Sequence, residues 1–155
     1  MSSKRYDYDY FVIGAGSGGV RSARIAAGHG AKVALAEGKF FGGTCVNIGC
    51  VPKKLMAYAA DYHAHFEDSK GFGWSYDKPR FDWPTLIKNK NNEIERLNGI
   101  YQSLLDKAGV AIFNHYASFI DEHTIEVGDQ KVTADKILIA TGGHPVSPDF
   151  DGADL

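Results

Sequence analysis

The only two cysteines of the 155-residue chain, Cys45 and Cys50, lie close together in a segment that contains glycine and proline, residues 42–54. In a regular helix the Cα atoms of residues i and i+5 are roughly 8 to 9 Å apart, whereas a disulfide needs less than about 7 Å. A disulfide between Cys45 and Cys50 therefore closes only if the backbone leaves regular helix here, and Gly49 and Pro52 favour such an irregularity. The pair predicts a redox-active disulfide.

The residues after the second cysteine predict where a helix begins. Pro52 suits the first residue of a helix that continues to about Phe66, because its missing N–H would have no helical partner there. Cys50 would then lie at the N-terminus of this helix. The partial positive charge of a helix N-terminus favours a thiolate.

Three other uses of the cysteines are weaker interpretations. They could be buried structural thiols, or they could bind zinc with His63 and His65, although that spacing is unlike the usual zinc patterns and we expect no metal. A structural disulfide would indicate an oxidising compartment. Residues 1–9 contain no apolar signal region, and no run approaches the length of a membrane span. We therefore expect a cytoplasmic protein, in which redox chemistry is the better explanation.

A glycine-rich turn precedes the cysteines. Residues 10–13 are an apolar run typical of a strand, residues 14–19 follow as Gly-Ala-Gly-Ser-Gly-Gly, and an apolar helical pattern begins at Val20. Gly14 permits a tight turn, Gly16 allows the backbone to approach a pyrophosphate, and Gly19 allows close helix packing. The helix N-terminus would face the phosphate charge, so the pattern predicts a dinucleotide site.

A second apolar run, residues 32–36, ends at Glu37. An acidic group at this distance from the glycine turn can accept hydrogen bonds from a ribose. A site for nicotinamide alone would continue into ordinary alternation of strands and helices, whereas here residues 42–44 lead at once to the cysteines. A flavin stacked on the cysteines accounts for both features.

These motifs resemble those of the flavoprotein disulfide reductases, and most closely their glutathione reductase branch. The glycine turn, Glu37, and the segments 42–54, 97–102 and 137–143 follow the order found in that family. The resemblance implies FAD as the cofactor, with Cys50 facing the flavin and Cys45 attacking the substrate disulfide. It also implies that Lys53 lies near the reactive edge of the flavin ring, where a cation would stabilise developing negative charge.

The resemblance also implies a larger set of cofactor contacts, which lie on the glycine turn, the cysteine segment or the ends of strands. The expected FAD-binding residues are Gly14, Gly16, Ser17, Gly18, Gly19, Glu37, Gly43, Thr44, Cys45, Lys53, Ala117, Ala140, Thr141 and Gly142.

The resemblance suggests glutathione disulfide as the substrate. Arg24 matches a substrate-contacting arginine, and Arg21 would project from the same helix face, although a small residue is usual there. Guanidinium groups can bind the carboxylates of this substrate in pairs of hydrogen bonds. Ser17 and Tyr101 match further substrate positions, but Tyr101 also fits an apolar helical pattern typical of core packing.

Other substrates stay open at this stage. Two arginines argue against the cationic substrate of trypanothione reductases, whereas dihydrolipoamide and mercuric reductases share the cysteine pattern. A different class of function is a non-catalytic nucleotide-binding or assembly module. The intact cysteines together with Lys53 argue against a loss of the chemistry by mutation.

Composition and the order of elements predict an α/β fold. The chain is 44% hydrophobic with a net charge of −2, which suits one globular domain and suggests neither nucleic-acid nor membrane binding. After a connection over 71–84 we expect a long helix that ends near Gly109, a strand over 110–113, a hairpin turn at Gly128-Asp129 and a strand over 137–140. The fold class would be a Rossmann-like FAD-binding domain, with a central parallel sheet and a small β-meander in a three-layer ββα arrangement.

The resemblance further implies that residues 1–155 are the N-terminal part of the FAD-binding domain of a longer homodimeric enzyme. The NADPH-binding and interface domains would lie outside this chain. In the longer enzyme, electrons would pass from NADPH to FAD, then to the Cys45–Cys50 disulfide, and then to glutathione disulfide. We expect the chain by itself to show no NADPH-dependent turnover.

Overall fold

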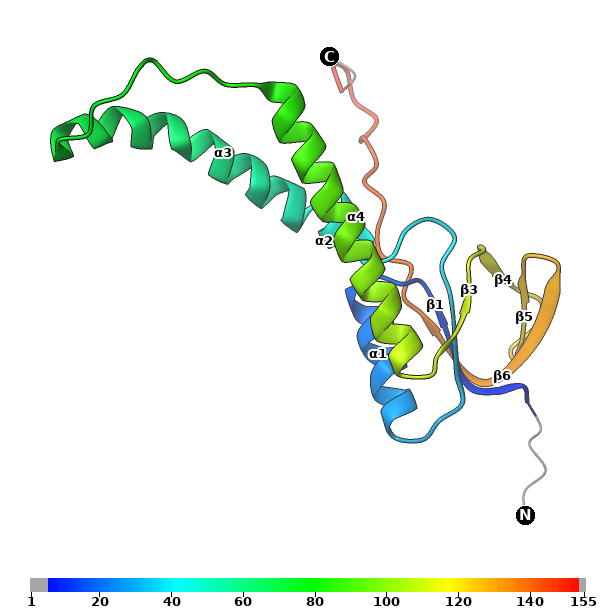
Figure 1. Ribbon diagram of the computed structural model, residues 1–155. Coiled ribbons are helices and arrows are strands. Elements are labelled where there is room, and N and C mark those ends of the chain that lie inside the picture. Colours follow the sequence, from blue (N-terminus) through cyan, green and yellow to red (C-terminus); the bar gives the residue numbers. More distant parts are fainter. Residues whose placement is uncertain (1–5, 154–155) are drawn as a thin grey trace.

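The computed structural model describes residues 6–153 as a sheet flanked by helices, with two helices that extend away from it (Figure 1). In chain order the elements are β1 (Tyr8–Ile13), α1 (Ser17–Gly28), β2 (Val33–Ala36), α2 (Gly43–Asn47), α3 (Cys50–Ser69), the 3₁₀ helix η1 (Lys70–Phe72), α4 (Trp83–Lys107), β3 (Ala111–Phe113), β4 (Ala117–Phe119), β5 (Thr124–Val127) and β6 (Gln130–Ile139).

The strands form one sheet in the order β3-β2-β1-β6-β5-β4. Strands β3, β2 and β1 run parallel, and β1 is also parallel to the second half of β6, from Ala134 to Ile139. The first half of β6 pairs antiparallel with β5, and β5 pairs antiparallel with β4. A single long strand therefore joins the parallel sheet to the meander, which confirms the predicted fold class.

Strand β2 and the second half of β1 are buried on both faces. Phe11 and Ile13 pack on one face with Ile125 and Val127 of the meander strand β5. Val12, between them, packs on the other face with residues of the helices, which include Leu105 of α4. Alternate residues of β1 thus contact the meander layer and the helical layer, as the period of two along a strand requires.

Several predicted boundaries are wrong. The helix expected from Pro52 to Phe66 begins at Cys50 and ends at Ser69, so Pro52 lies in its first turn, where proline is tolerated. The strand expected over 137–140 is only the end of the ten-residue β6. The short helix α2 was not predicted at all. The hairpin turn is confirmed, with Gly128 at a φ of +58°.

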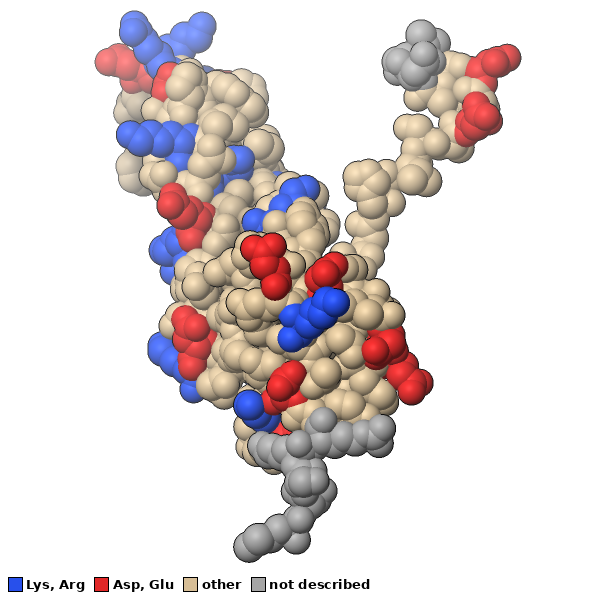
Figure 2. Space-filling model, turned by 90° about the vertical axis from the view of Figure 1, so that its right-hand side faces the viewer, with Lys and Arg blue, Asp and Glu red and all other residues tan. Residues whose placement is uncertain are grey.

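The outer parts of α3 and α4 form an extension that we call the arm, residues 53–95 (Figure 1). All of these residues are among those described, and none of them is buried. Its exposed aromatic residues are Tyr58, Tyr62, Phe66, Phe72, Trp74, Tyr76, Phe81 and Trp83. Figure 2 shows Lys and Arg interspersed with Asp and Glu over the visible face.

In the described part of the chain, no helix is long and apolar enough to cross a membrane.

Candidate active site

The glycine turn connects β1 to α1 beside the end of β6. Gly14 has a φ of +107°, and a side chain there would run into the carbonyl group of Ala140. The N–H of Ala140 donates to the carbonyl of Ile13 at 2.8 Å. Ser17, Gly18 and Gly19 are the first three residues of α1. The structure therefore brings the turn, the start of α1 and the end of β6 together, as the sequence predicts for a dinucleotide site.

Glu37 lies directly after β2, and its carboxylate is held against the glycine turn. One carboxylate oxygen accepts a hydrogen bond from the N–H of Ala15 at 2.7 Å. The other accepts from the N–H groups of Lys39 and Phe40 at 2.8 and 3.3 Å. A carboxylate offers about four acceptor positions, so these three bonds leave capacity for a ribose hydroxyl.

The two cysteines lie on different helices. Cys45 is half-buried in the five-residue α2, and Cys50 is the exposed first residue of α3. Between these helices the backbone leaves helical geometry at Ile48 (φ −135°, ψ 2°) and Gly49 (φ −124°, ψ −107°). This break confirms the predicted irregularity, and both cysteines are present as free thiols.

Neighbouring residues on α3 change the pKa of the Cys45 thiol. A hydrogen bond with the Cys50 side chain is the largest influence and raises the pKa of Cys45 above its ordinary value, and burial and the nearby Cys50 raise it further. The N–H of Cys50 and the cation of Lys53 act in the opposite direction. In the dithiol form, Cys50 is therefore the main influence on the pKa of the Cys45 thiol.

The glycine turn and the cysteine segment pack backbone to backbone. The N–H of Gly42 donates to the carbonyl of Ala15 at 2.8 Å. Gly43 has a φ of +60°, and a Cβ atom there would lie 2.7 Å from the Cα atom of Gly16. Only glycine fits this contact. A group bound on the turn would therefore lie next to the helix that carries Cys45.

The two neighbouring lysines of α3 have different environments. Lys53 follows the cysteines in the first turn of α3, where its N–H donates to the carbonyl of Gly49 at 3.0 Å, and its charge acts on Cys45. Lys54 places its Nζ atom 4.9 Å from the centroid of the Tyr58 ring. Lys53 is therefore the one of these two lysines whose charge bears on the pKa of Cys45.

The predicted substrate arginines line a groove between α1 and α4. Arg21 and Arg24 contribute from α1, and Lys107 contributes from α4, around a volume of about 400 Å³. The remaining lining residues are Ile25, Leu104 and Ala108, so the groove is lined by three cations and no acidic side chain. Tyr101, one turn before Leu104, is half-buried against the core cluster on the helical face.

The chain matches a known protein family, the pyridine nucleotide-disulphide oxidoreductases, over residues 8–155. It belongs to this family.

Curated relatives of the chain include glutathione reductases and a protein named thioredoxin reductase. The chain is 51% identical to a glutathione reductase of Nostoc sp. over 95% of its own length and 32% of that protein. It is 55% identical to a glutathione reductase of Burkholderia cepacia over 98% of its length and 34% of that protein. It is also 42% identical to a protein of Emiliania huxleyi named thioredoxin reductase SEP1, over 99% of its length and 34% of that protein. The chain thus spans about a third of the length of these relatives.

Sequence reasoning missed several residues of this oxidoreductase chain. The side-chain amides of Asn47 and Asn98 form a network under α2, and Lys107 joins the cationic groove. Tyr116, which is 76% exposed, lays its ring against Gly38, the residue after Glu37. Its position directly before Ala117, the first residue of β4, was the one available signal.

The remaining predicted cofactor residues lie at the end of β6 or on α2. Ala140 is half-buried against the core cluster on the helical face, and Thr141 and Gly142 follow it as exposed residues. Thr44 is exposed on α2 directly before Cys45. In this oxidoreductase chain the residues thus lie at the end of β6 or directly before Cys45. Their contacts with a cofactor stay predictions.

Proposed function

We propose that this chain is the N-terminal part of the FAD-binding domain of an FAD-dependent disulfide reductase whose substrate is glutathione disulfide. The observation that carries the proposal is the backbone contact between the glycine turn and the cysteine segment, made by Gly42 with Ala15 and by Gly43 with Gly16. The relatives named glutathione reductase support this assignment. The chain covers about a third of the length of each of them. NADPH would bind in a part of the longer enzyme outside residues 1–155.

The residues of the chain fit a dinucleotide cofactor. Gly16 and Gly43 carry no side chain where the turn meets α2, and Gly14 carries none where the turn meets Ala140 at the end of β6. Glu37 keeps acceptor capacity beside the turn. The first turn of α1 would face the pyrophosphate. When bound, the flavin would supply the two electrons that reduce the Cys45–Cys50 disulfide, with Lys53 at its reactive edge.

The thiols then carry out disulfide exchange with the substrate. The Cys45 thiolate attacks one sulfur of glutathione disulfide, which forms a mixed disulfide and releases one glutathione thiolate. Cys50 attacks the Cys45 sulfur of the mixed disulfide, which closes the Cys45–Cys50 bond and releases the second glutathione. The two protons of the original thiols pass to the released thiolates, so one dithiol and one disulfide exchange two electrons.

The cationic groove favours an anionic disulfide as the substrate. Glutathione disulfide carries several carboxylates, and Arg21, Arg24 and Lys107 offer three cations in one groove. Reaction of the reduced chain with glutathione disulfide should be about tenfold slower in Arg24→Ala, whereas reaction with the neutral hydroxyethyl disulfide should be unchanged. Equal slowing of both reactions would contradict this substrate assignment.

The cofactor assignment has a direct test. FAD is added to the purified chain, the mixture is reduced anaerobically with a dithiol, and the absorption spectrum is recorded. A long-wavelength band that Cys50→Ser abolishes would support a thiolate placed against a flavin. Failure of the chain to retain FAD would contradict the assignment for this chain.

We further propose a cytoplasmic location and a homodimeric longer enzyme.

A further inference from the structure

The helix that carries Cys45 is too short to be stable by itself. Helix α2 has five residues, and no side chain caps its N-terminus at Gly42. Isolated helices shorter than about 12 residues are marginal in water. The position of Cys45 relative to Cys50, which belongs to α3, therefore depends on contacts that α2 makes with other elements.

Two asparagine side chains make such contacts. The Asn47 side-chain N–H₂ group donates to the carbonyl oxygens of Phe41 and Gly43, at 2.9 Å each, and so ties the end of α2 to its beginning. The Asn98 side-chain N–H₂ group donates to the same Phe41 carbonyl at 2.7 Å and to the Asn47 side-chain oxygen at 3.0 Å. Both asparagines are half-buried, which limits replacement of these bonds by water.

Asn98 is the long-range member of this network. It belongs to α4, which packs on α1, α2 and α3, whereas Phe41, Gly43 and Asn47 are local to the cysteine segment. Asn98 thus anchors α2 to a helix that also contacts the helix of Cys50. A rigid anchor raises the effective concentration of one thiol at the other, since less conformational freedom is lost when the ring closes.

We propose that Asn98 is a positioning residue for the redox disulfide, acting through Asn47 and the Phe41 carbonyl to hold Cys45 where it can re-form its bond with Cys50. This inference rests on the proposed function. It assigns Asn98 no contact with substrate or cofactor. Its effect is on the equilibrium between the dithiol and the disulfide.

The test measures that equilibrium in the full chain without cofactor. The chain is equilibrated with mixtures of reduced and oxidised dithiothreitol, the thiols are alkylated, and the two forms are counted by mass. In this exchange the chain's dithiol and oxidised dithiothreitol give the chain's disulfide and reduced dithiothreitol. We expect Asn98→Ala to lower the equilibrium constant for disulfide formation about tenfold, which is about 30 mV toward a more positive potential.

Two comparisons separate positioning from general stability. Asn91→Ala, at an exposed position on α4 two turns earlier, should leave the constant unchanged. Asn47→Ala should lower it as Asn98→Ala does, and the double variant should be about as low as either single variant, because both amides act through one network. If Asn98→Ala lowers the unfolding midpoint but leaves the constant at the wild-type value, the proposal is overturned.

The outcome for the wild-type chain separates this inference from the proposed function. If the wild-type chain forms no Cys45–Cys50 disulfide, the proposed function fails and the role of Asn98 fails with it. If the wild-type chain forms the disulfide and the constant is unchanged in Asn98→Ala, only the role of Asn98 is overturned. If Asn98→Ala lacks native circular dichroism, Asn47→Ala decides, and an unchanged constant in that folded variant overturns the proposal.

Discussion

The arm and the rest of the described chain, which we call the body, hold their apolar residues in opposite environments. In the body, Phe11, Leu35 and Ile125 are fully buried between layers. In the arm, Phe72 is 85% exposed and Trp74 is 71% exposed. The body therefore has a core of its own, whereas the arm keeps its large aromatic side chains at the surface of this chain.

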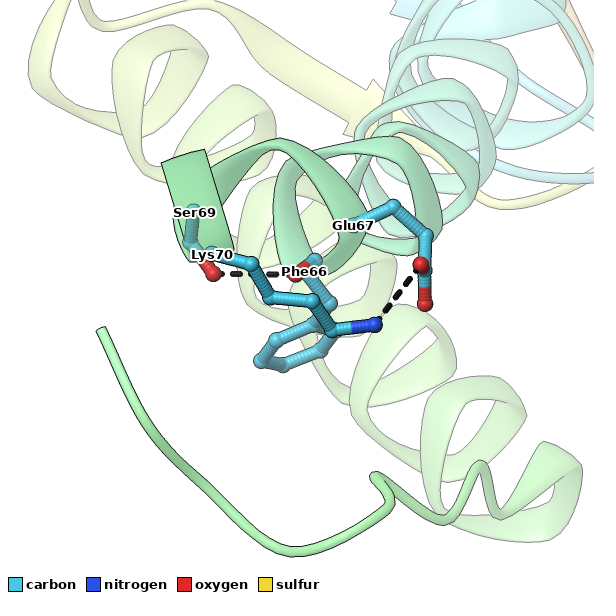
Figure 3. Close-up of polar contacts among 4 residues, drawn as sticks. All are labelled: Phe66, Glu67, Ser69 and Lys70. Carbon is cyan, nitrogen blue, oxygen red and sulfur yellow. Dashed lines mark hydrogen bonds and ion pairs between the residues drawn. The ribbon is translucent and has the colours of Figure 1, made fainter. Parts of the chain in front are cut away.

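The arm relies on local interactions within its helices. Asp82 caps α4 by accepting from the N–H of Thr85 at 2.9 Å. At the end of α3, Lys70 pairs with Glu67 at 2.8 Å, and the Ser69 hydroxyl donates to the carbonyl of Phe66 (Figure 3). Such contacts set helix ends but add little stability at an exposed surface. The two cysteines lie at the root of the arm, on α2 and at the start of α3, and not among its exposed aromatic residues.

The largest expected difference between the two regions comes from truncating one phenylalanine in each. Phe11→Ala should lower the free energy of unfolding by about 3 to 5 kcal/mol, because it opens a cavity between the sheet and the meander. Phe72→Ala should change it by less than about 0.5 kcal/mol, since its ring is already exposed. Urea unfolding followed by circular dichroism measures both. Comparable losses would show that the arm is stabilised by its aromatic residues.

Alanine substitution of glycines should give the next largest effect. Gly43→Ala should cost about 1 to 3 kcal/mol of unfolding free energy, because Gly43 has a left-handed conformation and its new Cβ would press on Gly16. Gly71, in the arm, has open space around the position of a Cβ. Gly71→Ala should therefore leave the urea midpoint unchanged. If Gly43→Ala is equally well tolerated, the tight contact between turn and cysteine segment is not required.

The next prediction concerns the pH dependence of Cys45 alkylation at the root of the arm. The hydrogen bond with Cys50 is the main cause that raises the pKa of Cys45, so Cys50→Ala should shift the pH midpoint of Cys45 alkylation downward. In the wild-type dithiol form, the raised pKa contributes stability that is present below the unfolded pKa of the thiol and is lost as the pH rises through the folded value. Alkylation rates by mass spectrometry give the midpoint. An upward shift in the variant would contradict the thiol pairing.

The smallest effect is expected for an ion pair of the arm. Glu67→Gln removes the contact with Lys70, but the two side chains are 61% and 58% exposed. Water and salt screen such a pair, so the thermal unfolding midpoint should not move. Wild type measured at high salt serves as the control and should behave alike. A clear drop in the midpoint would mean that the arm depends on its surface charges.

Much of the site could be predicted from short segments of the chain. The glycine turn, the position of Glu37 after a buried strand, and the break between the cysteines all follow from local sterics. The helix start at Cys50, rather than at Pro52, could not be predicted from this pattern, because proline is tolerated at several positions of a first turn. The catalytic and cofactor roles of these residues stay predictions.

The sequence by itself determined the conformations that a few neighbouring residues dictate. Gly14 and Gly43 adopt backbone angles that other residues avoid, and a disulfide between Cys45 and Cys50 is compatible only with a break in the helix between them. Only the tertiary structure decided that Gly43 meets Gly16, that Asn98 binds the Phe41 carbonyl, and that the aromatic residues of the arm stay exposed. The two contacts join residues far apart in the chain, and the exposure of the aromatic residues depends on what packs against them. All three features therefore depend on how whole elements pack and not on local preference.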